Sequence, residues 1–415
     1  MKSTEWKKNV AIMWFAQFIG MSAITGVIAF LPLYLTHLGV EEQSIGLWAG
    51  VLMGATSFCA ALSNPFWGSM ADRKGRKPMV EKVLFMFALI IVAMSYVTNV
   101  YQLLTLRILQ GLCGGFVAAS TALVVSMSPK EEIPFTVGLF QTALIVGGAA
   151  GPMIGGLIAD FFGYRVPFLF FGLFCLAALA LVRFAVTEQF TPVPKSQNAS
   201  LRQTFADVWS IVDLRIMLLV QFLAQFAVGS IAPILPLYIQ SMLSGQDNLA
   251  SIAGTIIAIA GVTSALMSAS MGALCKHFSH KQILTTAALL GAVSFAGQLL
   301  ATDVVTLSVL RGLNGLCIGA MVPSSNTIIT YLIPEAKRGA AYGVTSGASL
   351  MGNVLGPISA GLLARFFGLS AIFWLTSALF AAVAFLLFDK IKNGDSYQPA
   401  EALQTAGKMA HCGVK

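Results

Sequence analysis

The sequence predicts an all-α integral membrane protein with twelve transmembrane helices, arranged in two pseudo-symmetric six-helix bundles. Composition is the first observation behind this prediction: 57% of the 415 residues are hydrophobic and only 10% are charged. Soluble domains hold roughly 45–50% apolar and 25% charged residues. The apolar residues form continuous runs instead of alternating with polar ones, which excludes a transmembrane β-barrel. An internal repeat is the second observation.

Charged or Pro/Gly-rich breaks divide the chain into segments of the length that a membrane span needs, about 20 apolar residues. Residues 1–186 and 213–390 each hold six such segments, and 187–212 and 391–415 form a cytoplasmic linker and a cytoplasmic tail. Apolar residues recur at helical spacing in the linker, which predicts an amphipathic helix on the membrane surface. The expected spans are residues 9–36, 44–70, 79–98, 101–127, 134–160, 165–186, 213–241, 248–275, 281–301, 304–331, 338–365 and 369–389.

The repeat relates the two halves at an offset of about 204 residues. Leu31–Tyr34 returns as Leu235–Tyr238, and the pattern of Arg107–Cys113 returns in Arg311–Cys317. A long repeat within apolar sequence does not fit a solenoid, whose units are far shorter. Two membrane halves related by a repeat, with a binding site between them, is the plan of a secondary transporter.

The formal net charge is +8, and its distribution indicates topology. Only Arg165 and Arg365 fall in segments expected outside the cell, and Arg107 and Arg311 lie within spans. The remaining basic residues lie on the other side, together with both chain ends. Because cytoplasmic loops carry an excess of Lys and Arg, we expect both termini in the cytoplasm. The excess charge is therefore a topology signal, and no nucleic-acid partner is expected.

The sequence lacks the motifs of an enzyme or an ATP-driven pump. Five of the six cysteines lie within spans without C-x-x-C spacing, which favours helix packing over disulfides or metal binding. No phosphate-binding loop and no Ser/His/Asp set occurs, so ATP is not the energy source. We expect no cofactor, no metal and no enzymatic activity.

The loop between the second and third spans, Gly68–Lys77, carries the most specific motif. Gly68 lets two helices approach closely, and Asp72 can accept hydrogen bonds from a neighbouring helix N-terminus. This spacing resembles the signature loop of the major facilitator superfamily, and the resemblance covers the whole chain. It implies a conformational latch; the alternative is a basic topology loop. In the second-half copy of this loop, Lys276 stands at the position of Asp72. The implied latch residues are Gly68, Asp72, Arg73, Gly75 and Arg76.

Arg107 and Arg311 lie within the fourth and tenth spans. A buried charge in a span indicates function by default, because it is costly unless it faces a partner or a wet cavity. The family resemblance associates the position of Arg107 with proton coupling; the alternative is an arginine that snorkels or binds backbone carbonyls. His37 is a candidate proton carrier, although a lone rim histidine is more often a solvated residue. The sequence does not identify the carrier, because the nearest acids lie near span ends: Glu41, Glu42, Glu81, Asp160 and Asp303.

The fifth span combines glycines at four-residue spacing with a proline. Proline removes a backbone hydrogen bond and kinks a helix, and the glycines permit close packing. The spacing resembles the antiporter motif of drug:proton exchangers and nearly recurs in the eleventh span; ordinary glycine packing is the alternative. The expected hinge residues are Gly138, Gly147, Gly151, Pro152, Gly155, Gly352, Gly356 and Pro357.

A central cavity is expected between the halves. Few charges together with many Met, Phe and amide side chains suit variable amphipathic ligands. The candidate cavity residues are Gln17, Thr25, Tyr34, Gln141, Gln221, Gln225, Tyr238, Asn314 and Asn353.

Together these motifs resemble the drug:proton antiporter branch of the major facilitator superfamily, the MdtG-like multidrug resistance exporters. The resemblance implies efflux of amphipathic drugs or toxic small molecules by proton antiport and alternating access. It implies a bacterial cytoplasmic (inner) membrane as the location, with a small-molecule substrate, protons and the lipid bilayer as partners, and a monomer. An exporter of one metabolite, such as a sugar, a siderophore or another anionic or zwitterionic product, is the alternative. A membrane enzyme or receptor would need a catalytic set or a soluble domain, and the sequence has neither.

Overall fold

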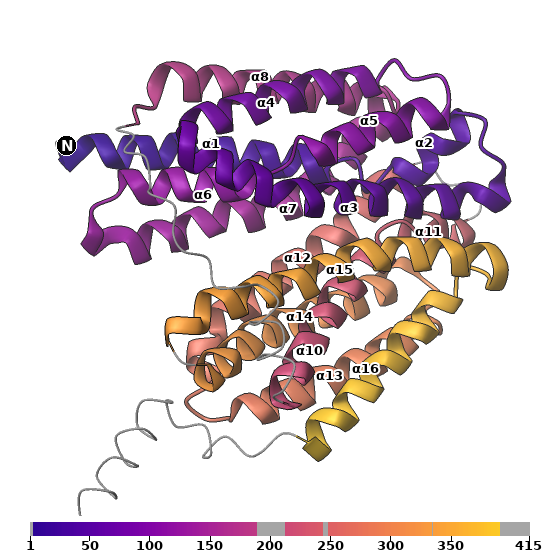
Figure 1. Ribbon diagram of the computed structural model, residues 1–415. Helices are drawn as coiled ribbons and strands as arrows, with labels where there is room; N and C mark the ends of the chain where they lie inside the picture. Colours follow the sequence, from indigo (N-terminus) through magenta and orange to yellow (C-terminus); the bar gives the residue numbers. More distant parts are fainter. Residues whose placement is uncertain (1–2, 189–211, 244–247, 334, 391–415) are drawn as a thin grey trace, which may run out of the picture.

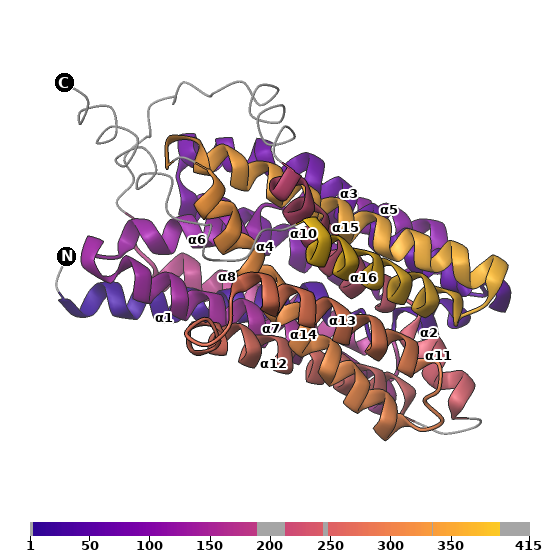
Figure 2. The ribbon, with the colours of Figure 1, turned by 90° about the horizontal axis from the view of Figure 1, so that it is seen from below.

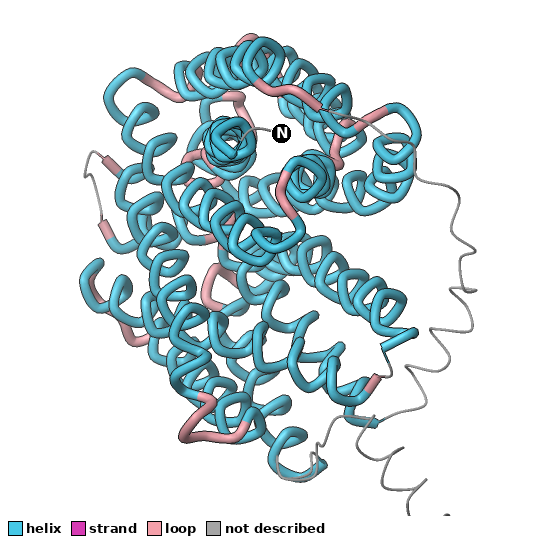
Figure 3. The backbone as a smooth tube through the Cα atoms, turned by 90° about the vertical axis from the view of Figure 1, so that its left-hand side faces the viewer, coloured by secondary structure: helices cyan, strands magenta, loops and turns pink. Residues whose placement is uncertain are grey.

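The computed structural model describes residues 3–188, 212–243, 248–333 and 335–390. These residues form helices joined by short loops, with no strand among them (Figure 3). The predicted amphipathic helix of the linker and the predicted tail fall outside the described residues. The prediction of an all-helical membrane protein is confirmed.

In the first half, each expected span coincides with one helix or a pair of short helices. The break between α5 and α6 falls at Gly115, whose φ of 89° is left-handed. The helices are α1 (Ser3–Thr25), α2 (Leu31–His37), α3 (Glu42–Lys74), α4 (Arg76–Met94), α5 (Val100–Leu112), α6 (Phe116–Met127), the 3₁₀ turn Lys130–Glu132, α7 (Ile133–Phe162) and α8 (Val166–Ala185).

The second half repeats this order of α-helices, except that the single helix α14 replaces α5 and α6. Gly114 and Gly115 separate α5 from α6, whereas their repeat mates Ile318 and Gly319 lie inside one continuous helix, α14. One glycine fewer leaves the backbone less free to leave the helix. The helices are α10 (Val212–Ile231), α11 (Leu235–Met242), α12 (Leu249–Leu274), α13 (His280–Gln298), α14 (Val304–Leu332), α15 (Glu335–Phe367) and α16 (Ala371–Lys390).

Within the described residues, nine helical segments are long and apolar enough to cross a membrane. α1, α4 and α13 fall outside that set because charged or polar residues occupy their first turns, such as Arg76 and Lys77 in α4. These three helices still occupy the expected spans 9–36, 79–98 and 281–301. These three helices differ from the nine others in the polarity of their ends and not in their agreement with the expected spans.

Each half has its own hydrophobic core, and four long helices join the halves. α3 packs against α15 and α7 against α12, and α2 lies near α11 at one end of the molecule (Figure 1). We call this end, which carries α2 and α11, the tip end. The opposite end, which carries the turn at Gly75 between α3 and α4, is the latch end. Figure 2 shows the same arrangement from below.

Glycine contacts show that the halves touch at the tip end. A Cβ atom at Gly50 of α3 would collide with the carbonyl oxygen of Pro357 in α15, and one at Gly156 of α7 with the carbonyl oxygen of Ala250 in α12. Toward the latch end the same four helices separate, as Figure 1 shows. The glycines there have open space around them: Gly68, Gly138, Gly272 and Gly343. The structure is therefore closed at the tip end and open at the latch end.

Candidate transport site

Arg107 is a buried arginine of α5, 5% exposed. Its Nη1 donates to Gln110 Oε1 over 3.0 Å, one turn along the same helix. Its Nε and Nη2 have no hydrogen-bond partner among the described residues, and no carboxylate pairs with it in that part of the chain. A buried guanidinium with N–H groups to spare can bind an anionic or hydrogen-bond-accepting group.

Arg311, the repeat mate of Arg107, is 7% exposed in α14. Its Nε has no hydrogen-bond partner in the described part of the structure. Asn314 lies one turn further on, is buried, and has both amide atoms unpartnered among the described residues. The two halves thus repeat a buried arginine followed by an amide, but only in the first half do arginine and amide bond to each other.

Gln17 and Gln221, which are repeat mates, have different surroundings. Gln17 in α1 is fully buried, and neither of its amide atoms has a partner among the described residues. Gln221 in α10 donates to Asn326 Oδ1 of α14 over 2.8 Å, and Ser349 Oγ of α15 donates to Gln221 Oε1 over 3.4 Å. The second-half glutamine therefore ties three helices together, whereas the first-half glutamine keeps its hydrogen-bonding capacity.

Four of the other expected cavity residues lie on α1, α7, α10 and α15. Thr25 of α1 donates to its own helix at Met21 O over 2.9 Å, and Gln141 of α7 is exposed. Gln225 of α10 faces α15, because a Cβ at Gly352 would lie 3.0 Å from the Gln225 Cβ. Asn353 of α15 donates to the carbonyl of Ser349 over 3.3 Å.

Tyr34 and Tyr238 bond to backbone carbonyls of their own halves near the tip end. Tyr34 Oη donates to Met94 O over 3.3 Å, and Tyr238 Oη donates to Gln298 O over 2.9 Å. Both rings pack against a phenylalanine at about 5 Å. The repeat of Leu31–Tyr34 in Leu235–Tyr238 thus marks an equivalent packing contact in each half.

The glycines of the hinge motif place α7 between α1 and α12. A Cβ at Gly151 would collide with Thr25 of α1, and one at Gly155 with the Gly26 carbonyl oxygen. Ser22 Oγ of α1 donates to Gly147 O over 3.2 Å. Gly138 lies in open space at the latch end. In the second half α15 is held likewise between α10 and α3, through Gly352, Gly356 and Pro357.

At the latch end, Gly75 makes the turn between α3 and α4 with a φ of 100°. Glu188, beyond the end of α8, accepts hydrogen bonds from Arg76 N and Lys77 N, each 2.9 Å long. Its carboxylate thereby caps the N-terminus of α4. Gly68 has open space around it and Arg73 is exposed, whereas the side chain of Asp72 lies outside the described part of the structure. The latch role of this loop stays a prediction.

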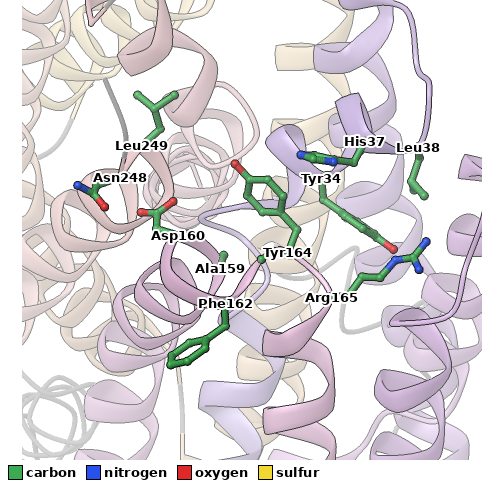
Figure 4. A pocket seen from close by; sticks show the side chains of 11 residues that line it. Tyr34, His37, Leu38, Ala159, Asp160, Phe162, Tyr164, Arg165, Asn248 and Leu249 are labelled. Atoms are coloured by element: carbon green, nitrogen blue, oxygen red, sulfur yellow. The ribbon is translucent and has the colours of Figure 1, made fainter. Parts of the chain in front are cut away.

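A pocket of about 790 Å³ opens at the tip end between the halves (Figure 4). His37 packs near Tyr164, with 4.9 Å between ring centroids. Burial raises the pKa of Tyr164, and the Asp160 carboxylate acts in the same direction. In Figure 4 the Arg165 guanidinium reaches the Tyr34 hydroxyl, and Asp160 points toward Asn248 at the start of α12. Asp160 accepts from Ser251 N over 2.7 Å.

Sequence reasoning missed the contacts of Glu188 and Asp160. Both are acids just inside or beyond a helix end, and each binds the N-terminus of a helix that is distant in the chain. No sequence signal marks them, because Gly75 before α4 and Asn248 before α12 are residue types that often cap helices. Only the structure shows that neither makes a side-chain capping bond.

A membrane-embedded helical fold in two repeated halves, closed at one end around buried polar side chains, defines the class of secondary transporters. The family model described as "Major Facilitator Superfamily" matches residues 13–246 and 217–410 of this chain. The chain belongs to the major facilitator superfamily, whose members are transporters and not enzymes. The expected membership of the major facilitator superfamily is thereby confirmed.

Two bacterial relatives are similar over nearly their whole length. The multi-drug resistance efflux pump PmrA of Streptococcus pneumoniae serotype 4 is 32% identical over 95% of this chain and 100% of its own. Multidrug resistance protein MdtG of Proteus mirabilis is 32% identical over 91% of this chain and 94% of its own.

Solved structures share the fold at lower identity. A point mutant of the nucleoside transporter NupG matches with a TM-score of 0.79 at 13% identity, over 93% of this chain and 100% of that one. The D-xylose-proton symporter matches with a TM-score of 0.71 at 16% identity, over 95% of this chain and 99% of that one. At these identities the likeness shows the fold alone.

Proposed function

We propose that this transporter exports amphipathic drugs or toxic small molecules in exchange for protons, by alternating access. The observation that carries the proposal is the position of the α7 hinge segment. Gly151 and Gly155 pack on α1, while Pro152 and Gly156 face α12 of the other half. A glycine-lined helix with an internal proline at the contact between halves can change its packing when that contact opens. The efflux named for PmrA and the multidrug resistance named for MdtG support the same proposal.

The basic residues of the loops support a cytoplasmic latch end, because positive charge gathers on the cytoplasmic side of membrane proteins. Residues 1–186 and 213–390 then act as two rocking bundles in a bacterial cytoplasmic membrane, with both termini inside. The present structure corresponds to the inward-open state. Substrate enters from the latch end and leaves after the contacts at the tip end have parted.

Arg107 is the residue for which we propose proton coupling, with Arg311 as its second-half counterpart. Because no carboxylate neutralises Arg107 in the described residues, its charge acts on whatever occupies the neighbouring space. A fixed buried charge repels a proton or a cation and attracts an anion or a polar acceptor. The charge of Arg107 therefore lowers the proton affinity of any titratable group that lies next to it.

The cavity residues that we propose for substrate contact are buried amides, one from each half. Gln17 and Asn314 have no partner among the described residues, so they can bind a ligand. Adaptable apolar contacts supply the remaining affinity, as suits chemically varied molecules. One chain contains both halves of the repeat. A monomer is therefore sufficient for transport.

Export of a single anionic or zwitterionic metabolite is the second candidate, and the two buried arginines favour it. Drug susceptibility of a pump-deficient bacterium separates the two. Expression of the wild type is expected to protect against several unrelated amphipathic cations, and Arg107→Ala is expected to remove the protection at equal protein level. Protection against none of them, with export of one anion only, would support the metabolite exporter and overturn drug efflux.

A further inference from the structure

The first turn of α12 lacks a cap from its own sequence. Asn248 precedes α12 with a left-handed φ of 74° and makes no capping hydrogen bond with its side chain. The first N–H groups of a helix have no partner within that helix and need acceptors from elsewhere. Other helices of this chain supply their own, as Asn99 does for α5, Ser279 for α13 and Asp303 for α14.

Asp160, near the end of α7, supplies the missing acceptor from the opposite half. Its Oδ2 accepts a hydrogen bond from Ser251 N over 2.7 Å, and its Oδ1 one from Ala250 N over 3.3 Å. Figure 4 shows the carboxylate turned toward the start of α12. A negative charge at a helix N-terminus also interacts favourably with the helix dipole. The two hydrogen bonds of Asp160 therefore place a negative charge at the N-terminus of α12, and they connect the two halves.

The backbone beneath Asp160 fixes this geometry. One turn earlier, Gly156 lies directly against the carbonyl oxygen of Ala250, and Pro152 lies against Gly254 a further turn along. Because these contacts hold α7 and α12 together at the tip end, the carboxylate meets the two amides only in the closed arrangement. A tip end that opens must break both hydrogen bonds.

The repeat does not provide a second copy of this contact. The mate of Asp160 is Arg365, near the end of α15, and a guanidinium cannot accept hydrogen bonds. Arg365 is exposed, and its guanidinium lies 6.0 Å from the centroid of the Phe366 ring. Of the two helix pairs that close the tip end, α7–α12 therefore carries a capping carboxylate where α15–α3 carries a cation.

We propose that Asp160 is a positioning residue of the transport cycle, which holds the tip end closed by clasping the N-terminus of α12 across the two halves. The clasp forms in the latch-open state and is released in the tip-open state. This inference concerns the movement and not the cargo. If drug export or proton coupling were disproved, the clasp proposal would still stand. If the clasp were disproved, the proposals of drug export and proton coupling would be unaffected.

Distances between the halves test the clasp directly. Pulsed electron paramagnetic resonance would be recorded on spin labels in a background whose six cysteines are replaced by alanine. One pair occupies Tyr96 and Leu300, exposed repeat mates at the tip end; the other occupies Phe184 and Phe388, exposed repeat mates at the latch end. Neither pair touches the site, and each reports one end of the molecule.

Asp160→Ala is expected to raise the tip-open to tip-closed ratio by roughly 2- to 30-fold, the range produced by loss of a helix cap. The tip-end distance lengthens while the latch-end distance shortens. Asp160→Asn keeps an acceptor without the charge and gives a smaller shift. Arg365→Ala, the matched control, leaves both distances unchanged.

Unchanged distances in Asp160→Ala would overturn the proposal. So would an equal shift in Arg365→Ala. Lengthening of both distances together would also overturn it, because that result describes a loosened protein and not a swing between two states.

Discussion

Gly254 of α12 lies directly against the carbonyl oxygen of Pro152 in α7, with no room for a side chain between them. The repeat reproduces this relationship, since Gly50 of α3 lies against the carbonyl oxygen of Pro357 in α15. Each hinge proline thus faces a glycine of the other half. Proline kinks its own helix, glycine lets the partner approach, and the two contacts together close the tip end.

Gly254→Ala is predicted to disfavour the closed tip end. The added methyl would overlap the Pro152 carbonyl oxygen, and overpacking costs about 1–3 kcal/mol in a packed interface. We expect the tip-end distance distribution to shift toward the open state by roughly tenfold, with reduced transport. Gly272→Ala is the matched control, because Gly272 of the same helix has open space around it. An unperturbed distance distribution in Gly254→Ala would contradict this account of closure.

Arg107→Ala is predicted to reduce efflux strongly without unfolding the protein. The arginine is buried with two nitrogens unpartnered among the described residues, so its removal relieves desolvation while it removes the charge. Loss of one hydrogen bond made by a charged group costs about 1.5–3 kcal/mol, or roughly 10- to 100-fold in transport. Transport rate and thermal unfolding midpoint would be measured on the same preparation. Full transport in Arg107→Ala would remove it from the mechanism.

Arg311→Ala is the internal comparison for that experiment. Arg311 lacks the hydrogen bond that Arg107 makes with the amide one turn on, and we expect a smaller effect on efflux. Equal losses in both variants would mean that the two halves contribute alike.

Glu188→Ala is predicted to loosen the latch end. Its carboxylate accepts the backbone N–H groups of Arg76 and Lys77, and loss of such a cap costs about 0.5–2 kcal/mol. We expect a lower thermal midpoint and faster hydrogen exchange at the start of α4, with Glu188→Gln in between. Glu132→Ala serves as control, because Glu132 is an exposed acid of the 3₁₀ turn. Equal exchange at α4 in both alanine variants would contradict the capping role.

Gln17→Leu and Gln221→Leu are predicted to act in different ways, although the two residues are repeat mates. Gln221→Leu leaves Asn326 and Ser349 without their partner and should destabilise the protein by about 1–3 kcal/mol. Gln17→Leu removes a buried amide that has no partner among the described residues, so stability should hold or rise while drug resistance falls. Thermal unfolding and resistance would be compared for both. A destabilised Gln17→Leu with normal resistance would assign Gln17 to packing.

The helical fold could be predicted from sequence because the property that decides it is local. Twenty apolar residues span a bilayer wherever they occur, so spans such as 134–160 coincide with helices such as α7. The break at Gly115 was not predicted. Glycine is common in transmembrane helices, and only the backbone angle of 89° distinguishes this one.

The contacts of Asp160 and Glu188 could not be predicted for a different reason. Each carboxylate meets amides about 90 to 110 residues away in the chain, and this pairing depends on how helices are rotated and packed. Rotation also decides that Gln17 is left without a partner among the described residues while Gln221 is held by α14 and α15. A repeat shows which positions correspond, but it does not show which of them bind the same groups.

The central claim is proton-driven export, and transport by purified protein in liposomes tests it most directly. Vesicles would be prepared with and without an imposed pH gradient, acid inside, and accumulation of ethidium, an amphipathic cation, would be recorded. The account predicts accumulation that requires the gradient, collapses with a protonophore and is lost in Arg107→Ala. Ethidium movement that is the same with and without the gradient would contradict it.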